Sequence, residues 1–184
     1  MISANGINWS AGETGNRMYS SNIIYDNTYI YNISSGLGWF YKSQDGLHWT
    51  MVWDPTGGSS GSLSLLEYSP TLNLYVLVKD NRQVWVSSDM INWTNVFTGI
   101  LKLMKTLKWD PYRNMFIIIA SGTSTGNFIY FSVDGMNWSA EETSSGVARY
   151  YYSTDFASNE NVIIVNSSSD DTKILVSSPA PTPV

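Results

Sequence analysis

The 184-residue sequence contains no cysteine, a single histidine and few charged residues. Without cysteine there is no disulfide framework and no thiol chemistry, and a lone histidine, His48, excludes a histidine-rich metal site. Charged residues make up only 14% of the chain, where about a quarter is usual, and the formal net charge is −5. A nucleic-acid footprint needs clustered lysine and arginine, so we expect no nucleic-acid partner.

The sequence also lacks a long apolar run and a basic leader. No stretch approaches the roughly 20 apolar residues needed to cross a bilayer, so we expect no membrane insertion. The N-terminal residues MISANGINWS contain no basic region followed by an apolar one, so we expect no signal peptide. These absences leave the location of the protein open.

What the sequence does contain is one phrase written four times. Apolar residues make up 43% and aromatics 14% of the chain, which predicts a globular domain. The phrases are SANGINWS from Ser3, SQDGLHWT from Ser43, SSDMINWT from Ser87 and SVDGMNWS from Ser132. Their tryptophans, at positions 9, 49, 93 and 138, are separated by 40, 44 and 45 residues. That period is typical of a four-stranded β-propeller blade of about 40–45 residues.

Each repeat also has the pattern of strands and turns that such a blade requires. In the third repeat, β-branched and aromatic runs bounded by Gly, Asn, Asp and Ser predict strands over 101–110, 115–121, 128–132 and 138–142. The run MFIIIAS is apolar nearly throughout, which indicates an inner strand buried on both faces. No segment shows a 3.6-residue period with caps, so we expect little or no helix.

The two ends of the chain complement one another. The last strand-like run, 173–178, aligns with the runs that precede the phrases, but no phrase follows it, while the first phrase begins at Ser3. We therefore predict an all-β fold: a four-bladed β-propeller of four-stranded antiparallel blades, closed by the N-terminal strand pairing with the C-terminal blade. The alternative passes the terminal strand to a neighbouring chain and gives a homo-oligomer or larger assembly.

The predicted domain spans residues 1–178, and a flexible Pro-rich tail follows at 179–184. The predicted blades cover approximately residues 14–58, 59–99, 100–144, and 145–178 together with 1–13.

The repeated phrase resembles the Asp-box, or BNR, repeat of sialidase-like propellers and of many non-catalytic ones. The matching positions are Ser3, Asn5, Gly6, Trp9, Ser43, Asp45, Gly46, Trp49, Ser87, Asp89, Trp93, Ser132, Asp134, Gly135 and Trp138. The first copy has Asn5 in place of the aspartate and the third has Met90 in place of the glycine. All four copies are one residue shorter between the acid and the tryptophan than the form common in sialidases.

The resemblance implies that the box is architectural. An aspartate can accept hydrogen bonds from amides of its own turn, a glycine tolerates positive φ, and the tryptophan fills space between sheets. The alternative is a catalytic or calcium-binding cluster of Asp45, Asp89 and Asp134. Equivalent residues of different blades lie apart around a rim, so we expect no such cluster and no metal.

Sialidase-like catalysis, as the resemblance implies it, needs three arginines around a carboxylate, a Tyr–Glu pair and an acid/base. The four arginines of this chain occupy no recognisable family motif, so we expect no catalytic residues and no cofactor. Gly- and Ser-rich loops opposite the boxes form a candidate ligand-binding face. The residues assigned to it are Arg17, Trp39, Trp53, Arg82, Arg149 and Tyr151.

Three functional classes follow. The preferred one is a non-catalytic propeller that acts as an interaction or structural module with a protein partner. The second is a carbohydrate-binding, lectin-like propeller that uses aromatic and hydroxyl-rich loops to hold a glycan, and the third is a sialidase-like glycosidase. Short boxes of this kind are similar to those in predicted phage and large-virus proteins. A virion-associated accessory or host-contact role is therefore a hypothesis for the setting.

Overall fold

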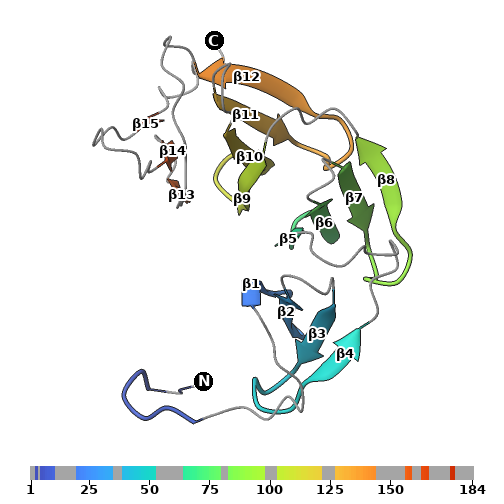
Figure 1. The fold of residues 1–184 in the computed structure, drawn as a ribbon, viewed down its shortest axis with the longest axis vertical. Helices are drawn as coiled ribbons and strands as arrows, with labels where there is room; N and C mark the ends of the chain where they lie inside the picture. Colours follow the sequence, from blue (N-terminus) through green and yellow to red (C-terminus); the bar gives the residue numbers. More distant parts are fainter. Residues whose placement is uncertain are drawn as a thin grey trace. The chain divides into compact units, whose positions relative to one another are not determined.

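A computed structural model of the chain describes residues 3, 5–10, 20–34, 39–52, 64–79, 83–97, 103–121, 127–143, 156–158, 163–165 and 175–176. Within these ranges all regular structure is β-strand, as Figure 1 shows. Since none of these residues is helical, they include no helix that could cross a membrane.

The strands form four separate antiparallel sheets in which each strand pairs with its neighbours in sequence. The first sheet contains β1 (Ser20–Tyr25), β2 (Ile30–Ser34), β3 (Phe40–Ser43) and β4 (Thr50–Val52). The second contains β5 (Ser64–Ser69), β6 (Leu74–Lys79), β7 (Gln83–Ser87) and β8 (Thr94–Phe97). The third contains β9 (Leu103–Asp110), β10 (Met115–Ser121), β11 (Asn127–Ser132) and β12 (Ser139–Thr143). The fourth contains β13 (Phe156–Ser158), β14 (Ile163–Val165) and β15 (Leu175–Val176).

The all-β class and the four-stranded antiparallel sheets predicted from the sequence are confirmed. The third repeat agrees almost residue for residue, because its turns are marked by Gly, Pro, Asn and Asp. The apolar run in β10 is buried as expected, with Phe116–Ala120 at most 2% exposed. The fourth sheet has three strands among the described residues. Its predicted fourth strand from the N-terminus and the count of four blades stay predictions, and the tail at 179–184 lies outside the described ranges.

The chain divides into two compact units. The first comprises Met1–Asn81 and Trp85–Thr94, and the second Arg82–Val84 and Asn95–Val184.

In the first unit, one face of the β1–β4 sheet packs against the second sheet. Side chains alternate along β1, as they must on a pleated strand: Ile24 is buried, whereas Ile23 and Tyr25 are 58% and 60% exposed. The backbone N–H of Leu66 in β5 donates to Asn22 Oδ1 at 3.0 Å, which joins the two sheets directly. The shared core consists of Ile24, Tyr31, Ile33, Phe40, Leu66, Tyr75, Leu77 and Met90.

The second unit has its core around β10. The Trp109 and Phe116 rings of β9 and β10 meet edge to face with centroids 4.8 Å apart. Tyr130 of β11 packs against Phe97, with centroids 6.3 Å apart. Aromatic pairs of this geometry add about 0.5–1.5 kcal/mol to the effect of area burial.

Candidate functional site

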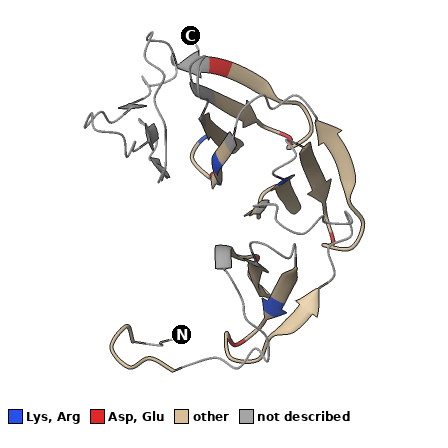
Figure 2. Cartoon of the chain, in the orientation of Figure 1, with Lys and Arg blue, Asp and Glu red and all other residues tan. Residues whose placement is uncertain are grey.

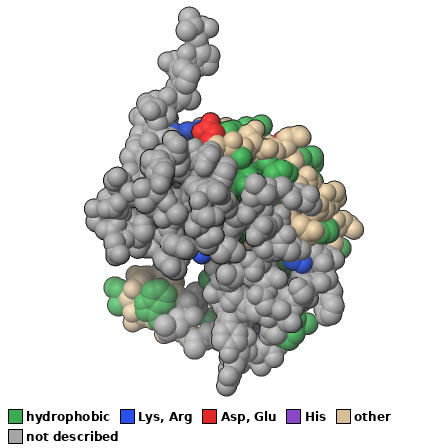
Figure 3. Space-filling view, turned by 45° about the horizontal axis from the view of Figure 1, so that its top comes forward, with side chains coloured by type: hydrophobic (Ala, Val, Ile, Leu, Met, Phe, Trp, Pro, Cys, Tyr) green, Lys and Arg blue, Asp and Glu red, His purple; other side chains and the backbone are tan. Residues whose placement is uncertain are grey.

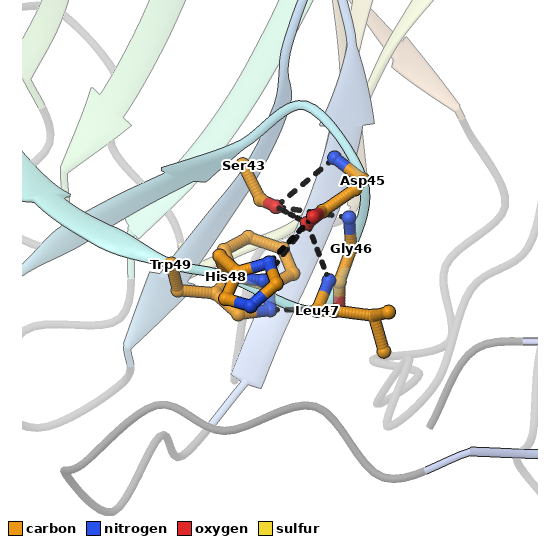
Figure 4. Close-up of polar contacts among 6 residues, drawn as sticks. All are labelled: Ser43, Asp45, Gly46, Leu47, His48 and Trp49. Atoms are coloured by element: carbon orange, nitrogen blue, oxygen red, sulfur yellow. Dashed lines mark hydrogen bonds and ion pairs between the residues drawn. The ribbon is translucent and has the colours of Figure 1, made fainter.

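The turn that follows β3 shows how the repeated phrase folds (Figure 4). The Ser43 hydroxyl donates to Asp45 Oδ1 at 3.0 Å and accepts from the backbone N–H groups of Asp45 and Gly46 at 3.3 and 2.9 Å. Asp45 Oδ1 also accepts from the N–H groups of Leu47 and His48, each at 2.8 Å. One serine and one carboxylate oxygen thus satisfy four backbone donors that a tight turn would leave to solvent.

The glycine and the tryptophan of the phrase complete this turn. Gly46 has φ +73°, a left-handed conformation in which a Cβ is unfavourable. Its carbonyl accepts the indole N–H of Trp49 at 2.9 Å, so the half-buried ring is fixed relative to the backbone. The polar atom of a large apolar side chain is thereby partnered within the turn itself.

The same arrangement occurs in the other copies. Asp89 Oδ1 accepts from two backbone amides at 2.8 and 2.7 Å, and Asp134 Oδ1 from two at 2.8 Å each. Asn5, which replaces the acid in the first copy, accepts from Ile7 N and Asn8 N at 2.9 Å through its amide oxygen. An amide oxygen can accept the same two backbone bonds as a carboxylate oxygen, which explains why the first copy forms the same turn.

The third copy differs at the glycine position. Met90 has φ +62° and is only 4% exposed, and its side chain belongs to the core of the first unit. In this copy the indole Nε1 of Trp93 is buried and has no hydrogen-bond partner, whereas Trp9, Trp49 and Trp138 each donate to the carbonyl of their glycine. The methionine therefore combines a strained backbone with a packed side chain.

The second carboxylate oxygen of each acid is also occupied. Asn92 Nδ2 donates to Asp89 Oδ2 at 2.8 Å, and Asn137 Nδ2 donates to Asp134 Oδ2 at 2.7 Å. In the second copy His48 Nδ1 lies 2.6 Å from Asp45 Oδ2, and since a carboxylate only accepts, the ring nitrogen donates. His48 is thus a polar turn residue, equivalent to the asparagines of the other copies.

These hydrogen bonds stabilise the ionised form of each acid. The backbone N–H of His48 is the main cause of the lowered pKa of Asp45, followed by its ring, and the N–H of Asn92 has the same effect on the pKa of Asp89. Hydrogen bonds, chiefly that from the backbone N–H of Asn137, lower the pKa of Asp134 to about 2. Carboxylates held this firmly in their ionised form are poor general acids.

We expect the boxes to make the fold sensitive to acid. A pKa that is lower in the folded chain than in the unfolded one contributes stability above the unfolded value, which is lost as pH falls through the folded one. Stability should therefore decrease from about pH 5 to about pH 2. Asp45→Asn, Asp89→Asn and Asp134→Asn combined should lower stability at neutral pH and flatten this decrease. Urea midpoints measured across that range test it, and equal slopes for both proteins would contradict it.

A second repeated hydrogen-bonding pattern, in the turn between the first two strands of the first three sheets, was not predicted. Asp26 Oδ1 accepts from the N–H groups of Thr28 and Tyr29, Ser69 Oγ from that of Leu72, and Asp110 Oδ1 from that of Tyr112. In each of these three turns an asparagine with positive φ follows the polar residue. These asparagines are Asn27, Asn73 and Asn114. The sequence signal is the recurrence of Asn-x-Tyr or Asn-x-Phe at this point of the first three repeats.

The turn at Asp26 is linked to the second sheet by tyrosines. The Tyr75 hydroxyl donates to Asp26 Oδ2, and the Tyr75 ring lies 5.8 Å from that of Tyr31 and 4.7 Å from that of Tyr68. Burial acts to raise the pKa of Asp26, but hydrogen bonds from Tyr29 N and Tyr75 outweigh it, so that the pKa is lowered. Burial raises the pKa of Tyr31 to about 12 and that of Tyr75 further. Both hydroxyls therefore stay protonated.

One residue of the predicted binding face lies among the described residues. Trp39 is half-buried immediately before β3. Arg17, Trp53, Arg82, Arg149 and Tyr151 lie outside the described residues. Arg113, the remaining arginine, donates to Asp110 Oδ2 at 2.9 Å. Among the described residues no group of three or more His, Asp or Glu side chains is placed to hold a metal ion.

Neither a protein-family model nor a curated protein matches the sequence. Solved structures do match the fold. A chain of the nidogen/laminin complex is 11% identical with a TM-score of 0.59, and the match covers 84% of this chain and 63% of that one. The GH74 xyloglucanase from Xanthomonas campestris is 13% identical with a TM-score of 0.58, covering 85% of this chain and 27% of the enzyme.

Structures of YCF48 also match the fold. YCF48 from Cyanidioschyzon merolae is 12% identical with a TM-score of 0.53, over 88% of this chain and 56% of that one. YCF48 bound to D1 peptide is 16% identical with a TM-score of 0.51, over 85% and 49%. At such identities the likeness shows the fold alone, and that fold is a β-propeller. The chain spans less than two thirds of the length of each of these proteins.

Proposed function

We propose that the chain is a non-catalytic β-propeller module that binds a protein partner. The observation that carries this proposal is the likeness to propellers seen with a polypeptide partner, in the nidogen/laminin complex and in YCF48 bound to D1 peptide. The fold is also similar to that of one glycosidase, but the match covers only 27% of that enzyme.

The chemistry of the box turns supports a structural scaffold rather than an active site. The carboxylates of Asp45, Asp89 and Asp134 each accept several hydrogen bonds within their own turn, so they are committed to the fold. A rigid scaffold of this kind positions variable loops and turns at the surface, where they can bind a partner. The low charge and the Asn- and Ser-rich composition also suit packing in an assembly, and a virus particle is the setting that we propose for it.

Selection of a displayed random-peptide library on the folded chain tests this function. We expect peptides to be enriched on the folded chain and lost when the same chain is unfolded in urea. A glycan array and a sialoside reporter are run in parallel. Binding to glycans without peptide enrichment would support a lectin-like function instead, and hydrolysis of the reporter would show an enzyme. Occurrence only in the cytosol of a cellular organism would refute the virion setting.

A further inference from the structure

One position of every box turn carries a large aliphatic side chain that the turn does not use. The residues are Ile7, Leu47, Ile91 and Met136, and only their backbone N–H groups bond to the acid or amide oxygen. Ile7 is 79% and Ile91 71% exposed, Met136 is 52% exposed, and Leu47 is half-buried. Internal packing therefore gives no reason for an aliphatic residue at the exposed positions.

In the first unit, Leu47 and Ile91 lie on one rim. The β1–β2 and β3–β4 turns are at the same end of the first sheet, because its strands alternate in direction. Tyr75, near the start of β6, bonds to Asp26 in the β1–β2 turn, so the corresponding end of the second sheet lies beside it. We call residues 26–29, 44–49, 70–73 and 88–93 the turn rim. Leu72 on this rim is also exposed, at 39%.

The turn rim is acidic as well as aliphatic. Its residues include Asp26, Asp45 and Asp89 and no lysine or arginine. Figure 2 shows acidic residues in red in the turns after β3 and β7. Lys42, in β3, is turned toward an aromatic ring, with Nζ 4.7 Å from the centroid of Tyr29. The negative electrostatic potential of the turn rim therefore favours a cationic partner. It repels a second copy of this chain, whose net charge is −5.

Scattered apolar residues are normal on a protein surface, and Figure 3 shows several hydrophobic side chains, in green, at the surface of the described part of the molecule. The turn rim differs from such scatter because Leu47 and Ile91 recur at one position of a repeated turn. Exposed aliphatic tips are poor contacts for the hydroxyls of a sugar, and acidic side chains repel an anionic lipid surface. A protein with basic and aliphatic side chains complements both properties.

We propose that the turn rim of the first unit docks a protein segment that carries lysine or arginine together with aliphatic side chains. Ile91, Leu47 and Leu72 supply the apolar contacts, and Asp45 and Asp89 supply the complementary charge. This inference rests on the proposed protein-binding function and assigns to it a surface and a partner chemistry.

Three short fluorescent peptides of equal length test the proposal: one alternating lysine and leucine, one glutamate and leucine, and one lysine and serine. Anisotropy with the full chain should show the lysine–leucine peptide binding about tenfold more tightly than either of the others, and more weakly as salt is added. Ile91→Ser and Leu72→Ser should each weaken its binding about fivefold. Ile23→Ser is the matched control, since Ile23 is 58% exposed on a strand, and it should leave binding unchanged.

Equal binding of the two lysine peptides would overturn the proposal, because charge alone would then explain it. So would an equal effect of Ile91→Ser and Ile23→Ser. Urea unfolding of each variant confirms that the side chains are removed from a folded chain. The peptides enriched from the library separate this inference from the proposed function. If they bind the Ile91→Ser variant as well as the original chain, protein binding stands and the rim is not its surface; if none is enriched, the function itself fails.

Discussion

Replacement of Tyr75 by alanine is expected to lower the free energy of unfolding by about 3–5 kcal/mol, as for other large buried side chains. Tyr75 is 6% exposed and lies in the core that the first two sheets share. Its ring contacts those of Tyr31 and Tyr68, and its hydroxyl donates to Asp26. The substitution therefore leaves a cavity and removes a hydrogen bond to a carboxylate at the same time.

Tyr75→Phe separates the two contributions. It keeps the ring and loses only the hydroxyl, so a smaller decrease of about 1.5–3 kcal/mol is expected. Tyr112→Ala is the control: this tyrosine is 58% exposed, and its loss should change stability by no more than about 0.5 kcal/mol. Urea unfolding followed by tryptophan fluorescence measures all three. A Tyr75→Ala variant as stable as Tyr112→Ala would show that this ring does not hold the two sheets together.

Interactions confined to a few neighbouring residues could be predicted from the sequence, and those across the fold could not. The resemblance implied that the acid of each phrase bonds to its own turn, and the hydrogen bonds of Asp45, Asp89 and Asp134 all join residues no more than three positions apart. The bond from Tyr75 to Asp26 joins residues 49 positions apart. No local pattern marks such a pair, because it depends on how two sheets meet.

The second repeated turn was missed for a different reason. Its polar residue is Asp26, Ser69 or Asp110, and the asparagine with positive φ follows at a different distance in the first sheet than in the other two. Because the residue types and the length of this turn change from sheet to sheet while its side-chain-to-backbone hydrogen bonding persists, the turn leaves only a weak repeat in the sequence. The box keeps its length, its serine and its tryptophan in all four copies, so its period was visible.

At Met90 the backbone conformation of the turn favours glycine, whereas packing of the core favours a large apolar side chain. With φ +62°, Met90 lies where the other copies have glycine, and a residue with a Cβ is less favourable there by about 1–2 kcal/mol. Its side chain is nevertheless 4% exposed and packed among core residues, and burial of a methionine contributes about 1.5–3 kcal/mol. The two effects are of similar size, which explains how methionine is tolerated.

This balance predicts an unusual order of variants. Met90→Ala loses the packing and keeps the strain, so the free energy of unfolding should decrease by about 2–4 kcal/mol. Met90→Gly loses the same packing but releases the strain, so it should be more stable than Met90→Ala by about 1 kcal/mol, the reverse of the usual preference for alanine over glycine. Met136→Ala, at an exposed methionine of an equivalent turn, should change stability by less than about 0.5 kcal/mol.

Urea unfolding of these variants also tests whether the buried indole of Trp93 is coupled to Met90. In the copies with glycine, the glycine carbonyl accepts the indole N–H, as Gly46 does for Trp49. If the glycine in Met90→Gly allows the same bond, the Gly variant gains a further contribution of about 1 kcal/mol, and the gap from the alanine variant widens to about 2 kcal/mol. If Met90→Ala proves at least as stable as Met90→Gly, backbone strain contributes nothing at this position, and side-chain packing alone determines the residue there.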